Sequence, residues 1–209
     1  MLLAHGSSDA RHAAQVRKLA ADVSSILGEA VDAAFLSDAR LPKGARVLPL
    51  FMGAGRHVVE DVPKLTAASR CVLLPPLGQH ADRIADLVTE RLACAGGRNN
   101  VIFILYHFTG FERLLAVLNS KTDIFSRYAL ASLHCDPSLT SALQLWRNED
   151  VTDVTVQPML LFDGKSMDRV RRITDAFDVT MGPVLSELEG FDALVADCFS
   201  YGITAVPTL

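Results

Sequence analysis

Two histidines in the first half of the chain have the residue type and the position to bind a metal ion. His5 comes directly after the apolar segment Leu2–Ala4, and His57 follows a glycine-containing loop after the apolar segment Val47–Met52. If these segments are parallel strands of one sheet, both imidazoles stand at its carboxyl edge, where the functional groups of α/β folds collect. Neutral imidazole is the commonest protein ligand for borderline divalent cations. The positions therefore predict a metal site, while a loop histidine hydrogen-bonded to backbone stays open as the alternative for each.

The residues around His57 suit a site for a flat or bulky ligand. Gly53 and Gly55 allow a close approach of backbone, and Arg56 is a candidate contact for an anionic substrate. Glu60 and Asp61 lie in the first turn of the helix expected after His57. There a carboxylate either interacts favourably with the helix dipole or accepts a proton from the substrate, and Glu60 is the candidate base.

Other polar residues are less specific. Ser7 either caps the helix expected after His5, a role for which Asp9 is as good, or hydrogen-bonds a ligand. His80 precedes a helix near the same edge and is a candidate pocket residue, whereas His12 is expected to be solvated. Basic residues that an anionic substrate would need are concentrated in the first-half loops: Arg11, Arg40, Lys43, Arg46 and Arg56.

Apolar segments of strand length alternate with amphipathic helical patterns along the whole chain. Such alternation predicts parallel strands that crossover helices cover on both faces. The expected strands are Leu2–Ala4, Ala30–Leu36, Val47–Met52, Cys71–Leu74, Val101–Tyr106, Tyr128–Leu133, Val151–Phe162 and Asp178–Pro183. The expected helices are Arg11–Leu27, His57–Thr66, Ala81–Ala95, Gly110–Asn119, Ser138–Trp146, Met167–Phe177 and Leu185–Tyr201.

The same order of segments occurs twice, and single residues recur with it. Three pairs of segments match in sequence order: Leu3–His5 with Leu105–His107, Val47–His57 with Val156–Ser166, and Val72–Pro76 with Val179–Pro183. Matches in a conserved order indicate a duplicated domain. We therefore expect two similar three-layer α/β/α domains with parallel sheets, residues 1–96 and 101–209, on either side of the turn-rich segment Gly96–Asn100.

Composition excludes several classes of protein. The 209 residues are 50% apolar and 21% charged, which is enough for a buried core, and the net charge of −4 argues against a nucleic-acid-binding protein. The longest apolar runs are far too short to span a membrane. The four cysteines form no C-x-x-C pair, which predicts buried, reduced thiols. Because the amino terminus has no secretory signal, we expect a cytoplasmic protein. We also expect it to be either a monomer or a homodimer.

Three motifs of the first half resemble those of the sirohydrochlorin chelatases, the class II, ATP-independent enzymes of cobalamin and siroheme synthesis. The motifs are Leu3-Ala4-His5-Gly6-Ser7, then Pro49–Val58 with Glu60-Asp61-Val62-Pro63, and Pro75-Pro76-Leu77-Gly78. The resemblance covers residues 2 to 95, and the second half is similar to the diverged copy in two-domain members. It implies a chelatase-like fold with His5 and His57 as metal ligands and catalytic residues. It also implies an anionic tetrapyrrole partner, sirohydrochlorin, bound in a cleft between the two domains.

The sequence departs from the family where members carry a glutamate after the second strand. Here the corresponding context is Phe35-Leu36-Ser37, and a serine supplies no carboxylate. Either Asp38, Glu60 or water then takes the place of that carboxylate, or metal handling is weakened.

The second half departs further from the family pattern. The alignment gives His107 the place of His5, whereas Ser166 stands where His57 would be. We therefore expect this copy to shape the pocket and not to bind metal.

The function implied by the resemblance is insertion of a divalent metal, which is a substrate here, into sirohydrochlorin. Co²⁺ for cobalamin synthesis is the first candidate, and Fe²⁺ for siroheme or Ni²⁺ are the alternatives, because metal choice depends on geometry and supply as well as on ligand type. Imidazoles hold such a cation at moderate strength, and His5, His57 or Glu60 would accept the pyrrole protons. A non-catalytic tetrapyrrole- or metal-binding protein is the second hypothesis, and a two-lobed small-molecule binder is the third.

Overall fold

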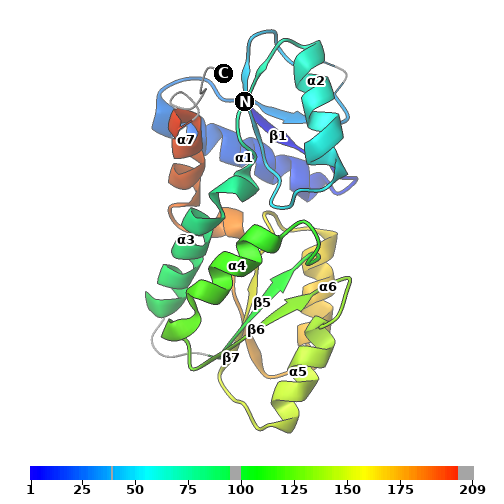
Figure 1. The fold of residues 1–209 in the computed structure, drawn as a ribbon, viewed down its shortest axis with the longest axis vertical. Coiled ribbons are helices and arrows are strands. Elements are labelled where there is room, and N and C mark those ends of the chain that lie inside the picture. The colour runs from blue at the N-terminus through cyan, green and yellow to red at the C-terminus, as the bar shows by residue number, and fades with distance from the viewer. Residues whose placement is uncertain (39, 95–99, 202–209) are drawn as a thin grey trace. The chain divides into compact units, whose positions relative to one another are not determined.

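The structure is a computed structural model that describes residues 1–38, 40–94 and 100–201. Its strands form two separate parallel sheets of four strands each, in the orders β2-β1-β3-β4 and β6-β5-β7-β8 (Figure 1). Helices flank both sheets. The predicted α/β fold with parallel sheets is confirmed.

The first sheet is built from short apolar strands, β1 Leu2–Ala4, β2 Ala33–Phe35, β3 Arg46–Pro49 and β4 Val72–Leu73. The helical elements that follow are α1 Ala10–Leu27, the π turn η1 His57–Asp61, α2 Val62–Ala68, the 3-10 turn η2 Leu77–His80 and α3 Ala81–Cys94. Helix α1 begins where the Asp9 side chain accepts a hydrogen bond from the Arg11 backbone N–H. Asp9 is therefore the cap of this helix, and Ser7 is not.

The second sheet has longer strands with the same connectivity: β5 Asn100–Leu105, β6 Arg127–Ser132, β7 Val154–Pro158 and β8 Val179–Met181. Its helices are α4 Glu112–Ser120, the 3-10 turn η3 Thr122–Ile124, α5 Leu139–Asn148, α6 Lys165–Thr174 and the 3-10 turn η4 Leu185–Glu187. The last helix of the chain is α7 Phe191–Tyr201. The central strand β5 is buried along Val101–Leu105, as expected for a parallel strand covered on both faces.

The chain forms two compact units. They differ from the predicted domains, residues 1–96 and 101–209, in the unit to which helices α3 and α7 belong. Unit 1 comprises Met1–Arg83 and Glu189–Leu209, and unit 2 comprises Ile84–Leu188. Helix α7 packs against α1 and therefore belongs to unit 1, while α3 enters unit 2 after Arg83. A repeat in the sequence shows which strands are related, but it does not show on which sheet each helix packs. Most of the predicted linker Gly96–Asn100 lies outside the described residues, because these leave out residues 95–99.

Hydrogen bonds between strands identify equivalent positions in the two sheets. In unit 1, Leu3 of β1 pairs with Pro49 of β3, and in unit 2, Ile104 of β5 pairs with Pro158 of β7. Each of these central-strand residues also accepts a hydrogen bond from the backbone N–H that follows the proline. Leu3 and Ile104 are therefore equivalent.

This register corrects the predicted match between His107 and His5. Counting from the paired residues, the counterpart of His5 is Tyr106, and His107 stands one residue further along the chain. The sequence alignment joined the two histidines because they are chemically alike. The hydrogen-bond ladder, and not residue type, sets the register of a parallel sheet.

The cysteines agree only in part with the prediction. All four are free thiols, but Cys198 alone is buried, Cys71 and Cys135 are half-buried, and Cys94 is exposed. No helix among the described residues is long and apolar enough to cross a membrane.

Candidate metal centre

His5 and His57 lie in contact at the carboxyl edge of the first sheet. His5 follows β1 directly, and Gly6 turns the chain away with a φ of 89°, a conformation that favours glycine. His57 begins the π turn that leads into α2. The two Nε2 atoms are 3.0 Å apart, and the imidazole ring centroids are 4.4 Å apart with the planes at 74°. The fold thus brings together two histidines that are 52 residues apart in sequence.

The Nδ1 atom of each histidine has an acceptor as its partner. Nδ1 of His5 lies 2.8 Å from the carbonyl oxygen of Gly6, and Nδ1 of His57 lies 2.6 Å from Oδ2 of Asp61. A carbonyl oxygen and a carboxylate only accept hydrogen bonds, so each Nδ1 carries the proton and donates it. The lone pair of each neutral imidazole is therefore on Nε2, and the two lone pairs point to the same place.

Two lone pairs at this separation repel each other unless a positive centre lies between or beside them. That centre is either a proton, which makes one imidazole cationic, or a metal ion. Two nitrogens that are each about 2.1 Å from one cation lie about 3 Å apart when the angle at the metal is near 90°. The 3.0 Å separation of the two Nε2 atoms fits this arrangement.

The two imidazoles open into a hollow of about 530 Å³. Its lining residues are His5, Leu36, Ser37, His57, Asp61, Lys64 and Leu65. Among the described residues, no group of three or more histidine, cysteine, aspartate or glutamate side chains could hold a metal ion. A cation at the histidine pair would therefore take its other ligands from water or from a bound molecule.

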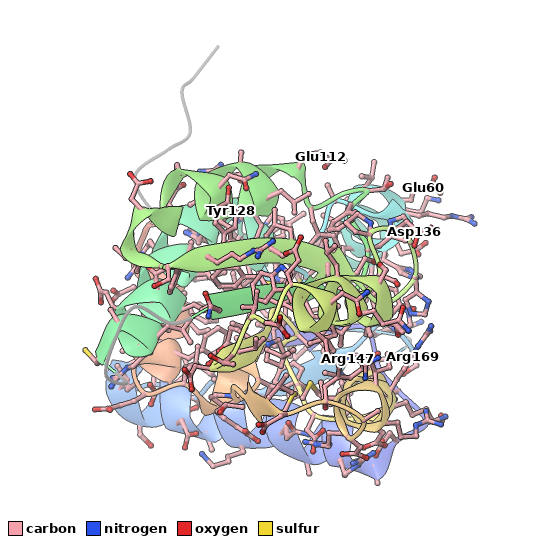
Figure 2. The ribbon with its side chains drawn as sticks, turned by 90° about the horizontal axis from the view of Figure 1, so that it is seen from below. Glu60, Glu112, Tyr128, Asp136, Arg147 and Arg169 are labelled. Carbon is pink, nitrogen blue, oxygen red and sulfur yellow. The ribbon has the colours of Figure 1, made fainter. Side chains whose placement is uncertain are left out.

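Of the two carboxylates expected in the turn after His57, Asp61 is the one that contacts the imidazole. Glu60 lies at the surface, where its Oε2 is 3.3 Å from Nε of Arg56 and 3.7 Å from Nζ of Lys64 (Figure 2). The signal for Asp61 was its spacing, because residues four apart on a helical turn face each other. The role of Glu60 as a base stays a prediction.

The other predicted site residues surround the pair at varying distance. Oγ of Ser7 accepts a hydrogen bond from the backbone N–H of Asp9. The carbonyl of Gly55 accepts the first backbone hydrogen bonds of the π turn, and a side chain at this residue would meet open space. Gly53 precedes this turn in the same loop, and His80 ends the turn η2 and does not line the hollow.

His12 is half-buried and not solvated as expected. Burial lowers the pKa of His12, the nearby His5 lowers it further, and Asp9 opposes both effects. The ring of His12 lies 6.3 Å from that of Phe35, on the sheet side of α1.

The basic residues expected around the site are distributed differently. Lys64 is the basic residue that lines the hollow. Arg40 and Lys43 instead line, together with Arg70, a second hollow that precedes strands β3 and β4, at the amino edge of the sheet. Arg11 is paired with Asp9 at 2.7 Å.

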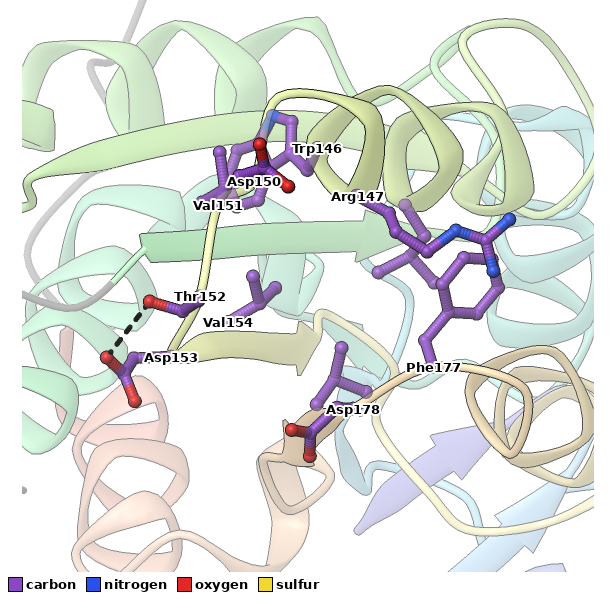
Figure 3. A pocket seen from close by; sticks show the side chains of 11 residues that line it. Trp146, Arg147, Asp150, Val151, Thr152, Asp153, Val154, Phe177 and Asp178 are labelled. Carbon is purple, nitrogen blue, oxygen red and sulfur yellow. Dashed lines mark hydrogen bonds between the residues drawn. The ribbon is translucent and has the colours of Figure 1, made fainter.

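Unit 2 has a hollow of about 320 Å³ at the amino edge of its own sheet, before β7 and β8 (Figure 3). Its polar lining is mostly acidic, with Asp150, Asp153 and Asp178, and the guanidinium of Arg147 lies 5.0 Å from the Phe177 ring centroid. The equivalent hollows of the two units thus carry opposite charge. Neither hollow includes the strand carboxyl ends where the histidine pair lies.

The sequence model of one family, CbiX, matches residues 1–95. This part of the chain is similar to the CbiX family. It includes both histidines, Asp61 and every lining residue of the hollow. No curated protein matches the chain in sequence.

Two solved structures share the fold over nearly the whole chain. One is CbiX, the terminal enzyme for the biosynthesis of siroheme in denitrifying bacteria, with 17% identity and a TM-score of 0.78 over 96% of this chain and 97% of the other. The other is the sirohydrochlorin chelatase SirB from Bacillus subtilis subspecies spizizenii in complex with cobalt, with 18% identity and a TM-score of 0.67 over 97% and 92%. At these identities the similarity establishes the fold. The structural similarity to the solved CbiX covers 96% of the chain. It therefore extends into unit 2, beyond residues 1–95 that match the CbiX family in sequence.

Proposed function

We propose that this chain is a sirohydrochlorin chelatase that inserts a divalent metal ion, with Co²⁺ as the first candidate, into the tetrapyrrole. The observation that carries the proposal is the pair of Nε2 atoms that lie 3.0 Å apart, while the Nδ1 atom of each ring contacts an acceptor. The CbiX-family match over the residues that form this pair supports it. The fold shared with two proteins of siroheme and sirohydrochlorin chemistry supports it as well.

The pair suits a metal that must be handed on. Two imidazoles bind a borderline cation with moderate strength, and a cluster of thiolates would retain it more firmly. Because two protein ligands, and no third among the described residues, converge here, the pyrrole nitrogens of the macrocycle can replace water on the cation one after another. The metal leaves the histidines when the macrocycle has completed its own coordination.

The same histidines can accept the protons that the macrocycle loses. When the cation departs, Nε2 of His5 and Nε2 of His57 regain free lone pairs and can take up a pyrrole proton. Asp61 stabilises a cationic His57 through the hydrogen bond at Nδ1. Each proton then leaves to solvent, because the side chains of His57 and Asp61 are 47% and 41% exposed.

Metal choice is open between cobalt and iron on two observations. The SirB structure contains cobalt, and the CbiX structure is that of the terminal enzyme for the biosynthesis of siroheme. Ser37 lines the hollow where a carboxylate would add a third, harder ligand. The chain therefore offers a nitrogen-only pair, which suits either metal.

The test is an anaerobic absorbance assay of the full chain with sirohydrochlorin and Co²⁺, Fe²⁺ or Ni²⁺ in parallel. We expect insertion well above the spontaneous rate for at least one metal, and loss of that activity in His5→Ala and His57→Ala with the fold retained. Wild-type rates in both variants would refute the ligand assignment. Tight binding of sirohydrochlorin or metal without faster insertion would indicate a non-catalytic carrier.

A further inference from the structure

The carboxyl edge of the second sheet carries its own cluster of polar and aromatic side chains. Tyr106 directly follows β5, and His134 lies two residues beyond the end of β6. Arg169 projects from the first half of α6, the helix after β7 (Figure 2). The chain leaves β5 towards β6 on one side and returns as β7 on the other, so these strand ends form the switch point of the sheet. Ligands of open α/β sheets bind at such points.

His134 occupies the place that Ser37 occupies in unit 1. Ser132 and Phe35 each pair with the last residue of their central strand, and His134 and Ser37 each follow two residues later. The two units therefore present different chemistry at equivalent positions. Unit 1 has one histidine directly after β1 and one in the η1 turn, and unit 2 has a tyrosine directly after β5 and a histidine after β6.

A buried hydroxyl fixes the two loops that carry Tyr106 and His134. The side chain of Ser132 donates to the carbonyl of Tyr106 at 3.1 Å and accepts from the backbone N–H of His134 at 3.1 Å. Ser132 is fully buried. The rings of Tyr106 and His134 lie 4.4 Å apart between centroids at 51°. The Ser132 hydroxyl thus connects the backbone of the two loops and fixes where Tyr106 and His134 lie.

Arg169 and His134 contact each other directly, with no carboxylate between them. Nη1 of Arg169 lies 3.4 Å from Nδ1 of His134. A guanidinium only donates, so Nδ1 accepts and the imidazole proton is on Nε2. Burial lowers the pKa of His134, and the neighbouring charges of Arg169 and His107 lower it further. Within the described part of the chain, no acceptor contacts Nε2 of His134, and Arg169 has no ion pair.

We propose that Arg169, His134 and Tyr106 form a binding site on unit 2 for a carboxylate of the anionic tetrapyrrole. Guanidinium groups bind carboxylates through two parallel hydrogen bonds, and the Nε2–H of His134 is a further donor. The Tyr106 ring is 48% exposed and offers an apolar face beside the donors to a flat, conjugated ligand. The inference rests on the proposed function for the identity of the ligand, because a sirohydrochlorin substrate is what supplies carboxylates on a planar macrocycle.

The experiment measures equilibrium binding of metal-free sirohydrochlorin to the full chain, with no metal added. Arg169→Gln and His134→Ala should each weaken binding, Arg169→Gln by on the order of tenfold, as expected for loss of a charged hydrogen bond. Arg172→Gln is the matched control, because Arg172 is exposed on the same helix and its Nε bonds only to the carbonyl of Asp168. The control removes the same charge and should bind as wild type. Thermal unfolding of each variant checks the fold.

Three results separate this inference from the proposed function. Wild-type affinity in Arg169→Gln, or equal losses in Arg169→Gln and Arg172→Gln, would overturn the carboxylate site. Weaker sirohydrochlorin binding in Arg169→Gln with unchanged Co²⁺ binding to the protein alone would support it. If the wild-type chain binds sirohydrochlorin through Arg169 but inserts no metal, the chelatase proposal fails and the carboxylate site stands.

Discussion

Asp61 lies 2.6 Å from Nδ1 of His57, whereas its sequence neighbour Glu60 is turned towards Arg56 and Lys64. The π turn that starts at His57 places the fifth residue of the turn, and not the fourth, against the imidazole. Two adjacent carboxylates therefore have different surroundings. Asp61 holds the ring of His57 with Nε2 facing His5, and Glu60 is solvated among basic residues.

Replacement of Asp61 by asparagine should weaken metal binding while leaving the fold intact. An amide is a poor partner for the Nδ1–H of a cationic or metal-bound imidazole and can reverse the tautomer, which would remove the lone pair from Nε2. We expect a 10- to 100-fold loss of Co²⁺ affinity by calorimetry, the range typical of such supporting groups. An unchanged affinity would show that Asp61 does not orient His57.

Glu60→Gln provides the comparison for Asp61→Asn. Since Glu60 does not contact either histidine, its replacement should change Co²⁺ affinity by less than about twofold. If Glu60 accepts a proton during insertion, as its sequence position suggests, the variant will lose insertion rate at unchanged metal affinity. Equal losses of metal affinity in both variants would point to a general effect of negative charge near the site.

Replacement of Ser37 by glutamate should tighten metal binding. Ser37 lines the same hollow as His5, His57 and Asp61, and its Oγ would lie 3.8 Å from a side-chain carbon placed at Gly6, next to His5. A carboxylate here would add an anionic ligand to two neutral ones, which favours a divalent cation. Calorimetry with Co²⁺ should show at least a tenfold gain for Ser37→Glu and none for Ser37→Gln. Equal affinities in wild type and Ser37→Glu would mean that this position does not reach the cation.

The sequence predicted those features of the site that depend on strand ends. An apolar run followed by histidine is visible in one dimension, and the carboxyl ends of parallel strands meet at one edge whatever the loops do. The contact between His5 and His57 was predictable for this reason. The choice between Glu60 and Asp61 was less clear, because side chains three and four residues after His57 both lie on its side of a helical turn.

The second unit shows where pattern matching fails. Matching like residues placed His107 opposite His5, but the strand register places Tyr106 there. The cluster of Tyr106, His134 and Arg169 could not be predicted from the sequence for a related reason. Its members come from three strands or helices, and only the register of β5 with β6 brings the first two together.

Cys198 should make the stability of unit 1 depend on alkaline pH. Burial raises the pKa of its thiol to about 11, although the nearby Arg83 acts in the opposite direction. The thiol is neutral in the folded protein up to that pH, whereas in the unfolded chain it ionises near pH 9. The contribution of this thiol to the unfolding free energy should therefore be complete below pH 9. It should be lost between pH 9 and 11, where the unfolding free energy falls by on the order of 2 kcal/mol.

The measurement is urea unfolding from pH 8 to 11 of wild type and Cys198→Ala, because lysines and tyrosines also titrate in this range. The difference in unfolding free energy between the two proteins should shrink as the pH rises. In native protein at pH 8, a thiol reagent should label the exposed Cys94 and leave Cys198 unmodified. Rapid labelling of Cys198 under those conditions would contradict its burial.

Gly78, in the Pro75-Pro76-Leu77-Gly78 motif, should be intolerant of any side chain for a reason of packing. A carbon added at Gly78 would lie 2.2 Å from the carbonyl oxygen of Met52, and the Gly78 N–H donates to the carbonyl of Phe51. The clash is with backbone, so it cannot be relieved by a rotamer change. Gly78→Ala should lower the unfolding free energy by about 1–3 kcal/mol, as overpacking does, and displace the loop that carries His57.

Gly55→Ala is the matched control, because a side chain at Gly55 meets nothing within 4 Å. Its unfolding free energy should stay within about 1 kcal/mol of the wild-type value. Since the loop from Met52 to Arg56 positions His57, we also expect Gly78→Ala to lose Co²⁺ affinity and Gly55→Ala to keep it. Equal stability of the two variants in urea unfolding would show that the Gly78 backbone can move away from Met52 at no cost, and that the motif serves something other than this contact.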